Sequence, residues 1–369
     1  MNKEKLIHSH TKSLLIRLII YHINMAKQIS RIFLVILLLM AMITPMAKAQ
    51  SNVKQPSSII KLPKNGNKGI NFDDLRYFSQ LNSVAVPAAQ TGDLDLINPK
   101  NNNVTVFPSV AEKVAAPGGD DQGATSVAYG NGYLFVGNHA RVSVAIVNPK
   151  NKQLIKRHKL AGDYDFLRYL RSRHELWVTE LGKNQIEILK FSKKPTPKLV
   201  HKAFISVPGG PEGLIFDKKR NRVYTNLRSN KTLAISLSGH KIVSRWPNTC
   251  HHSRGLAQQG KYLFVGCGEG AAVTLNVNNG KIISKVSTAK GVDLIAYNRR
   301  NHHLYIPGAR SGKMTVLRVS NNGHLHHNSA YKTARGAHCI TKAPDGKVFV
   351  CDPQAGNIIV INDQSRGTH

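Results

Sequence analysis

An all-β fold built from seven copies of one four-stranded unit is what the sequence predicts, and two observations predict it. Seven apolar positions are each followed, ten residues later, by a second apolar position in another β-branched or aromatic segment. The pairs are Val84 with Leu94, Leu134 with Val144, Leu176 with Ile186, Val223 with Leu233, Leu263 with Val273, Leu304 with Met314 and Val348 with Ile358. Successive copies begin 50, 42, 47, 40, 41 and 44 residues apart. Short strands that repeat every 40 to 50 residues or so are typical of a β-propeller, here one with seven blades.

The chain begins with a segment that has the features of an export signal. Arg31 precedes the apolar run 32–43, and Ala47 and Ala49 complete an A-x-A site. A positive flank, a short apolar core and small residues at the cleavage site define a secretory signal peptide, and the run is short for a membrane span. We therefore expect residues 1–49 to be the signal peptide of a periplasmic or secreted protein, with Met25 as an alternative start. An uncleaved N-terminal anchor is the other interpretation.

The remaining chain divides into an N-terminal segment at 50–69, the propeller at 70–363 and a short tail at 364–369. The seventh copy lacks a fourth strand, because little chain follows Ile361. An open sheet edge invites pairing with other chains, and residues 57–62 are the spare strand-like segment. We predict that this segment completes the last blade as its outer strand, which makes the mature chain one domain with a large core.

Each copy is expected to form four antiparallel strands. The fourth copy illustrates the pattern, with β-branched and aromatic residues at 213–216, 222–225, 232–235 and 241–244 separated by Gly, Asn and Lys. Alternating apolar residues predict strands, and Gly, Pro and Asn preset the dihedral angles of the turns between them.

Four cysteines fit an oxidising compartment. Cys250 and Cys267 flank one predicted hairpin symmetrically, and Cys339 and Cys351 flank another. The repeat register thus selects the pairs 250–267 and 339–351 from the three pairings that four cysteines allow. Four buried reduced thiols are the alternative. Zinc is disfavoured, because neither pair has C-x-x-C spacing.

The position at the start of the innermost strand is polar in every copy. Its seven residues are Asp73, Thr125, Asp165, Glu212, Arg254, Asp293 and His338. Because innermost strands of a propeller converge on its axis, we expect these side chains to meet at the mouth of the axial channel. Carboxylates in such a cluster raise one another's pKa unless a cation compensates, and their oxygens suit hard cations. The pattern predicts a polar ligand site, with Ca²⁺ or another divalent cation as a candidate occupant. Turns that favour polar residues for solvation are the alternative.

Local catalytic motifs do not occur in the sequence. It contains no G-x-S-x-G, phosphate-binding glycine loop, H-E-x-x-H or C-x-x-C-H motif. His251 and His252 lie beside Arg254 at the expected channel entrance, and the other paired histidines fall in loops of separate blades. A binding function is therefore favoured over an enzymatic one.

The charge balance is strongly basic. The chain has 52 basic and 20 acidic residues, and removal of residues 1–49 leaves 45 and 19, a net charge of +26. Such a field favours anionic partners, including nucleic acid and acidic polysaccharide. The basic residues are scattered over turns and outer strands, so a solvated rim explains them equally well.

Segments of the fourth copy resemble the YVTN-type β-propeller repeat family: Gly-Pro-Glu-Gly-Leu at 210–214, Arg-Val-Tyr-Thr-Asn at 222–226 and Thr-Leu-Ala-Ile at 232–235. The resemblance extends over about residues 70–363 and implies an exported, often periplasmic, binding platform. Related propellers include lactonases and gluconolactonases that hold a divalent metal at the channel mouth. That relation implies Asp165, Glu212 and Asp293 as metal ligands, with His338 as general base.

Three functions follow as hypotheses. The first is a non-enzymatic, monomeric binding or scaffold protein that takes a small molecule or a protein partner at the channel mouth. The second is a metal-dependent hydrolase of the lactonase type. The third is an envelope protein that binds an anionic polymer through its basic surface.

Overall fold

The computed structural model describes residues 21–23, 25–29, 53–63, 69–113 and 123–363. Contacts divide the chain into two units, Met1–Ser51 and Asn52–His369. In the first unit, residues 21–23 and 25–29 are helical. The rest of the expected signal peptide and the expected tail at 364–369 lie outside the described residues. Within the described ranges, no helix has the length and apolar character needed to cross a membrane.

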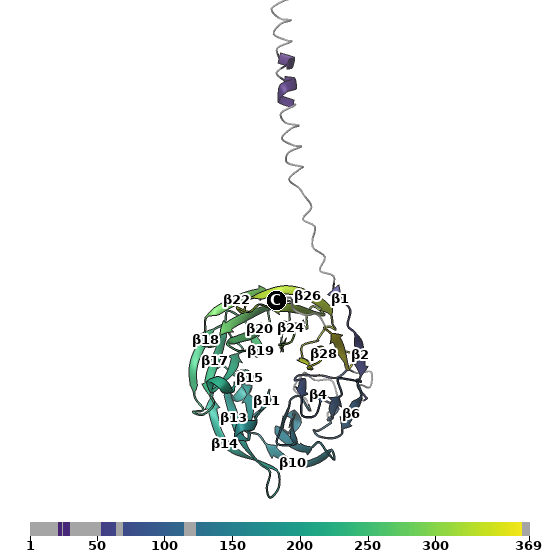
Figure 1. Cartoon of the computed structure of the whole chain (residues 1–369), viewed down its shortest axis with the longest axis vertical. Coiled ribbons are helices and arrows are strands. Elements are labelled where there is room, and N and C mark those ends of the chain that lie inside the picture. The colour runs from purple at the N-terminus through teal and green to yellow at the C-terminus, as the bar shows by residue number, and fades with distance from the viewer. Residues whose placement is uncertain (1–20, 24, 30–52, 64–68, 114–122, 364–369) are drawn as a thin grey trace, which may run out of the picture. The chain divides into compact units, whose positions relative to one another are not determined.

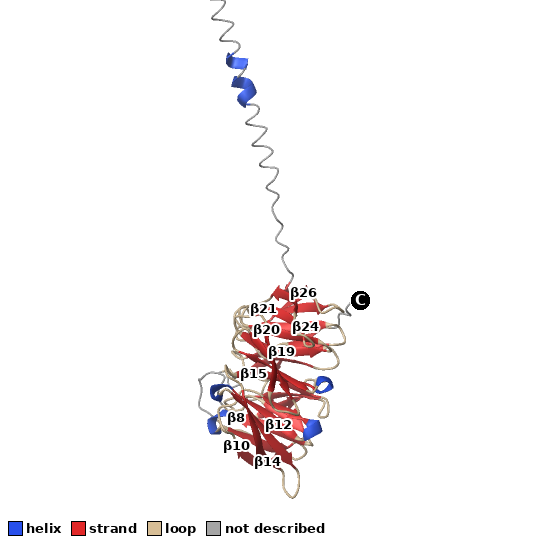
Figure 2. Ribbon diagram, turned by 90° about the vertical axis from the view of Figure 1, so that its left-hand side faces the viewer, coloured by secondary structure: helices blue, strands red, loops and turns tan. Residues whose placement is uncertain are grey.

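The second unit is a ring of seven antiparallel blades, as Figures 1 and 2 show, so the predicted seven-bladed β-propeller is confirmed. The first blade comprises β3 (Arg76–Phe78), β4 (Ser83–Pro87), β5 (Leu94–Ile97) and β6 (Val104–Phe107). The second comprises β7 (Val127–Gly130), β8 (Tyr133–Asn138), β9 (Ser143–Asn148) and β10 (Gln153–Lys159). The third comprises β11 (Leu167–Leu170), β12 (Glu175–Glu180), β13 (Gln185–Ser192) and β14 (Lys198–Ser206). The fourth comprises β15 (Pro211–Asp217), β16 (Arg222–Leu227), β17 (Lys231–Ser236) and β18 (Ile242–Pro247).

The last three blades complete the ring. The fifth comprises β19 (Ser253–Gln259), β20 (Tyr262–Cys267), β21 (Ala271–Asn276) and β22 (Ile282–Ser287). The sixth comprises β23 (Ala296–Asn298), β24 (His303–Gly308), β25 (Lys313–Val319) and β26 (Leu325–Lys332). The seventh comprises β27 (Ile340–Lys342), β28 (Lys347–Asp352) and β29 (Asn357–Asn362) with β2 (Ser58–Lys61). In the described part of the chain, four 3₁₀ turns join strands: η1 (His139–Arg141), η2 (Arg171–Arg173), η3 (Leu181–Lys183) and η4 (Lys218–Arg220).

The N-terminal segment closes the ring. Strand β2 lies within the predicted segment 57–62 and pairs antiparallel with β29, with Ile60 opposite Ile358. The preceding strand β1 (Val53–Lys54) adds parallel to β26 and so extends the sixth blade to five strands. The sequence did not predict this second attachment, because two residues are too few to show a periodic pattern.

The repeated apolar pairs form the centre of each blade. All fourteen residues of the seven pairs are fully buried. They lie on second and third strands, which have neighbours on both edges, while the packed faces of adjacent blades cover their side chains. Aromatic residues fill the larger spaces between blades. Phe135 of the second blade, for example, stacks on Tyr169 of the third at 5.1 Å between ring centroids.

Both expected disulfides are present, Cys250–Cys267 and Cys339–Cys351. In each, the first cysteine lies just before an inner strand and the second lies on the neighbouring strand of the same blade, with Cα atoms 5.2 and 5.6 Å apart. Two of the seven inner strands are therefore covalently tied where they enter the ring.

Backbone hydrogen bonds join neighbouring blades where their inner strands begin. Asp74 N donates to Thr125 O at 3.1 Å, Gly255 N to Asp293 O at 2.8 Å and Leu294 N to His338 O at 3.0 Å. Each of these bonds links one blade to the next beside a residue of the predicted polar ring. The side chains at that level are thus carried on a connected backbone.

Candidate functional site

The seven residues of the predicted polar ring all lie at the start of an inner strand or within three residues before it. Glu212 and Arg254 are the second residues of β15 and β19, and the other five precede their inner strands. The surroundings of the seven side chains differ, although their places on the backbone are equivalent.

Glu212 is at the centre of an ion-pair cluster. Its side chain is buried, and Arg254 Nη1 donates to Oε1 while Arg228 Nε donates to Oε2 at 2.9 Å. Burial opposes ionisation of Arg254, but the charges of Glu212 and Asp293 together raise its pKa. Both oxygens of this carboxylate are therefore engaged by arginines from two blades.

Asp165 faces the same cluster without such compensation. Its Oδ2 is shielded from solvent and has no hydrogen-bond partner among the described residues. Burial, followed by the negative charges of Glu212 and Asp293, raises its pKa well above the ordinary aspartate value. The structure thus brings three of the predicted carboxylates into electrostatic contact, and Asp165 holds its proton to higher pH than an ordinary aspartate.

Replacing Asp165 by asparagine is expected to raise the melting temperature at neutral pH. A carboxyl whose folded-state pKa is raised contributes stability that is fully present below its unfolded pKa, about 4, and is lost as pH rises through the folded value. The gain in Asp165→Asn should therefore vanish near pH 4 and grow toward pH 8 in melting curves. Asp163→Asn, two residues away at an exposed position, should show no such trend. A lower melting temperature for Asp165→Asn at neutral pH would contradict the assignment.

His338 lies close to two carboxylates of the ring. A ring nitrogen of His338 and a carboxylate oxygen each of Asp73 and Asp293 lie within 4.8 Å of one another. The imidazole Nδ1 is 2.6 Å from Gly336 O, and Nε2 is 2.7 Å from Phe72 O in the first blade. Carbonyl oxygens only accept hydrogen bonds, so both contacts are satisfied together when the ring carries two protons. As a general base, His338 would first have to leave one of these carbonyls.

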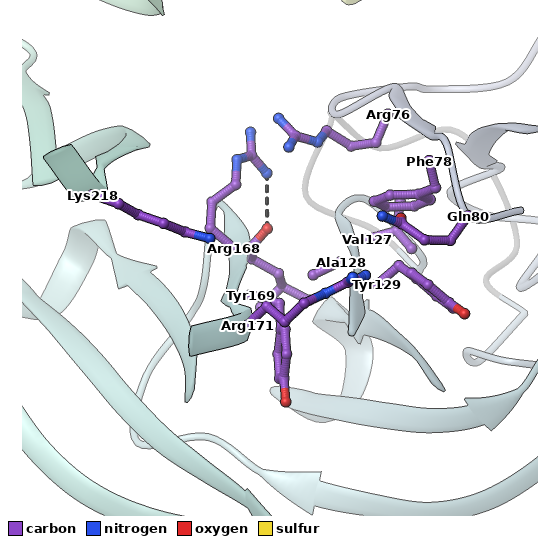
Figure 3. A pocket seen from close by; sticks show the side chains of 11 residues that line it. Arg76, Phe78, Gln80, Val127, Ala128, Tyr129, Arg168, Tyr169, Arg171 and Lys218 are labelled. Atoms are coloured by element: carbon purple, nitrogen blue, oxygen red, sulfur yellow. Dashed lines mark hydrogen bonds between the residues drawn. The ribbon is translucent and has the colours of Figure 1, made fainter. Parts of the chain in front are cut away.

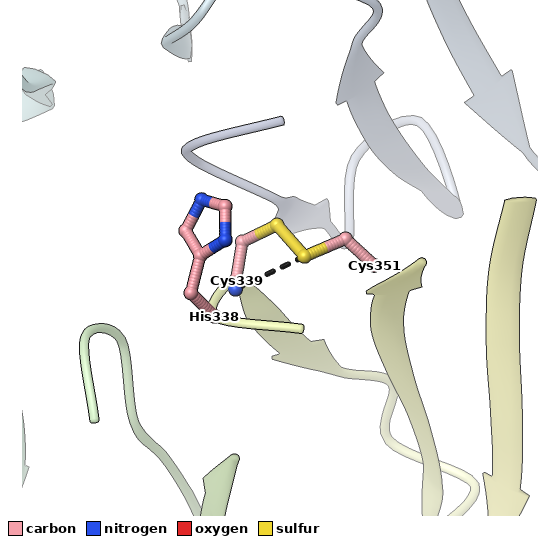
Figure 4. Close-up of side chains that lie close together, drawn as sticks. All are labelled: His338, Cys339 and Cys351. Atoms are coloured by element: carbon pink, nitrogen blue, oxygen red, sulfur yellow. Dashed lines mark hydrogen bonds between the residues drawn. A yellow bond between two sulfur atoms is a disulfide. The ribbon is translucent and has the colours of Figure 1, made fainter. Parts of the chain in front are cut away.

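A disulfide bond lies beside His338. Figure 4 shows the imidazole next to Cys339 and Cys351, whose sulfur atoms are bonded to each other. Cys339 N also donates to Cys351 Sγ at 3.1 Å. These sulfurs are therefore not thiolate ligands, and the disulfide instead fixes the backbone that carries the histidine.

The residues implied as metal ligands do not form a matching donor set. Glu212 gives both oxygens to arginines, and Arg228 and Arg254 place two positive charges among the three carboxylates. Hard cations in proteins are held by several free oxygen ligands. Asp73, Asp293 and His338 come closer together, but both nitrogens of that histidine face carbonyl oxygens. The arrangement is that of a charged polar site, and no catalytic step through a metal follows from it.

A hollow of about 720 Å³ opens at this level of the channel. Of the seven predicted residues, three line it, Arg254, Asp293 and His338, and four do not, Asp73, Thr125, Asp165 and Glu212. Thr125 is instead buried, with its hydroxyl 2.9 Å from that of Tyr164. The lining also includes three residues with titratable side chains that are absent from the predicted ring, His252, Glu269 and Arg310.

The added residues bring a second charge of each sign to the hollow, beside Arg254 and Asp293. Glu269 accepts from the backbone N–H groups of His251 and His252 at 2.9 and 3.2 Å. Glu269 and Arg310 both lie in turns between second and third strands, which meet the starts of the inner strands on the same face. Following those turns through the repeat register would have found both residues, and the proximity of His252 to Arg254 was visible in the sequence.

Comparison with known proteins supports the fold. No protein-family model and no curated protein sequence matches the chain. A chain in the crystal structure of the mitotic checkpoint complex superposes with a TM-score of 0.69 at 13% identity, covering 85% of this chain and 95% of that one. Virginiamycin B lyase from Staphylococcus aureus gives 0.64 at 13% identity over 82% and 98%. The WD40 β-propeller domain of Doa1 gives 0.61 at 13% identity over 85% and 99%. At such identities the likeness shows the β-propeller fold alone and not an activity.

Proposed function

We propose that the protein is an exported, non-enzymatic binding protein of the YVTN type, whose channel mouth takes a small polar ligand or a polar loop of a partner. The observation that carries the proposal is the hollow lined by Arg254, Asp293 and His338. Its walls contain two carboxylates, Asp293 and Glu269, and two guanidinium groups, so a ligand that presents both cationic and anionic groups complements it best. The likeness of YVTN segments supports the family, and the leader supports export.

The test uses a double variant of the hollow. Asp293→Asn with Arg310→Gln removes one charge of each sign from the lining and leaves the net charge unchanged. A thermal-shift screen of zwitterions, dipeptides and polyamines should identify ligands that stabilise the wild-type protein, and the double variant should lose at least tenfold in affinity for them. Asp345→Asn with Arg245→Gln, both at exposed positions outside the hollow, is the matched control and should bind like wild type. Equal binding by the hollow variant would overturn the proposal.

A metal-dependent lactone hydrolase is the second candidate, favoured by one observation, the proximity of Asp73, Asp293 and His338. Virginiamycin B lyase shows that an enzyme can use this fold. Elemental analysis, with melting curves in EDTA and in added Ca²⁺, separates the two functions. For a binding protein we expect no stoichiometric metal and no change in melting temperature. Stoichiometric metal together with a shift that Asp293→Asn abolishes would favour the hydrolase, and lactones would then be tested as substrates.

A further inference from the structure

The opposite part of the channel contains a cluster of positive charge that the predicted polar ring does not include. Two further hollows, of about 330 and 320 Å³, share Arg76 and Arg168 in their linings. The first is formed largely by inner strands of five blades and also contains Lys342, and the second also contains Arg171 and Lys218. Across both linings, as far as the described residues go, five cationic side chains face a single carboxylate, that of Asp74.

Both carboxylate oxygens of Asp74 accept hydrogen bonds from Arg168. Arg168 Nη1 donates to its Oδ2 at 2.6 Å and Nη2 to its Oδ1 at 3.1 Å, a bidentate pair between the first and third blades. Ser126 Oγ adds a third hydrogen bond to Oδ2 at 2.8 Å. The carboxylate is 1% exposed, so the pair is a buried unit in which one negative charge meets one positive charge.

Arg76 is left without the corresponding partner. The repeat gives Arg76 and Arg168 equivalent places, because Leu-Arg-Tyr recurs at 75–77 and 167–169. The residue before this Leu-Arg-Tyr segment is Asp74 in the first blade and Phe166 in the third. The centre of the Phe166 ring lies 5.0 Å from the Arg168 guanidinium carbon. Among the described residues, the side chain of Arg76 has no hydrogen-bond partner, although its backbone pairs with that of Ala85 in the sheet.

The two guanidinium groups therefore face each other with one charge uncompensated. Figure 3 shows them close together, at the edge of the space that Arg171 and Lys218 also line. The charge of Arg168, followed by burial, lowers the pKa of Arg76 to about 10, so Arg76 still carries its charge at neutral pH. Arg168 Nε is also buried and has no hydrogen-bond partner in the described part of the chain. A guanidinium whose N–H donors are unpaired, next to a second positive charge, is what an oxyanion requires.

We propose that Arg76 and Arg168, with Lys342 beside them, form a second ligand site in the channel that binds a small oxyanion, the phosphate or carboxylate group of a small molecule. Arg76 offers a free fork of N–H donors, and the bidentate pair with Asp74 holds the Arg168 side chain, with its positive charge, in place beside it. The volume of each hollow fits a small ligand and not a polymer chain. This site is separate from the hollow at the mouth, with which it shares no lining residue.

Inorganic phosphate and citrate are the probes, titrated into the purified protein by calorimetry at constant ionic strength. We expect saturable binding of at least one of them, and at least tenfold weaker binding by Arg76→Gln. Arg245→Gln, which removes an exposed arginine on the outer strand β18, should bind like wild type, as should Asp293→Asn at the mouth. Without anion, Arg76→Gln should melt no lower than wild type, because the substitution removes a repulsion and no hydrogen bond. Failure of both anions to saturate, or equal affinities of Arg76→Gln and wild type, would overturn the site.

Discussion

Ile60→Ala is expected to lower the free energy of unfolding by about 2–5 kcal/mol, the usual range for removing a buried isoleucine side chain from a packed core. Ile60 is 6% exposed and lies opposite Ile358, on the one strand that closes the ring from the N-terminal side. Among the described strands, β2 has only β29 as a sheet neighbour, so the contacts of Ile60 are a large part of what holds it in the ring. Urea denaturation followed by tryptophan fluorescence and by far-ultraviolet circular dichroism measures it.

The adjacent residue provides a matched control. Ile59 lies on the same strand, opposite Ile359, but is 56% exposed. Successive side chains on a strand point to opposite faces, so Ile59→Ala has the same effect on strand propensity and removes no core contact. It should change the free energy of unfolding by no more than about 0.5 kcal/mol. Similar losses in the two variants would show that β2 does not close the seventh blade in this register.

The repeat made the fold predictable. Apolar positions ten residues apart, such as Leu263 and Val273, mark two adjacent strands of one blade, and both are fully buried in the structure. The spare segment at 57–62 and the symmetric cysteines followed from the same register. Two-residue β1 shows where such reasoning stops, because its place beside β26 depends on the route of the chain around the ring and not on a local pattern.

The candidate sites were predictable only in part. Register placed Asp165, Glu212 and Asp293 at one level, but it does not say which charges find partners. That depends on turns of variable length, which bring Arg228 to Glu212. The channel arginines show the same limit. The Leu-Arg-Tyr repeat at 75–77 and 167–169 was present in the sequence, yet a contact between residues 94 positions apart becomes visible only when the ring is assembled.

Arg168→Gln is expected to destabilise the protein by about 3–5 kcal/mol, because removing one partner of a buried ion pair leaves the other charge uncompensated. The side chain of Asp74 is 1% exposed and would keep only the hydrogen bond from Ser126 Oγ. The double variant Asp74→Asn with Arg168→Gln removes both charges and should recover most of the loss, as a double-mutant cycle in urea would measure. Arg171→Gln, at an exposed position three residues on, should have little effect.

The size of the loss also tests the division of roles between the two channel arginines. If Arg76 could turn to Asp74 when Arg168 is absent, Arg168→Gln would cost less than about 1 kcal/mol, and adding Arg76→Gln would bring the full penalty. If Arg168 alone holds Asp74, the single variant carries the full penalty and Arg76→Gln adds nothing. The second outcome is expected, because Asp74 meets Arg168 with both oxygens while Arg76, two residues later at the start of β3, makes no hydrogen bond to it. Arg76 then remains available for an anion, and the buried ion pair with Asp74 holds the side chain of Arg168 in place beside it.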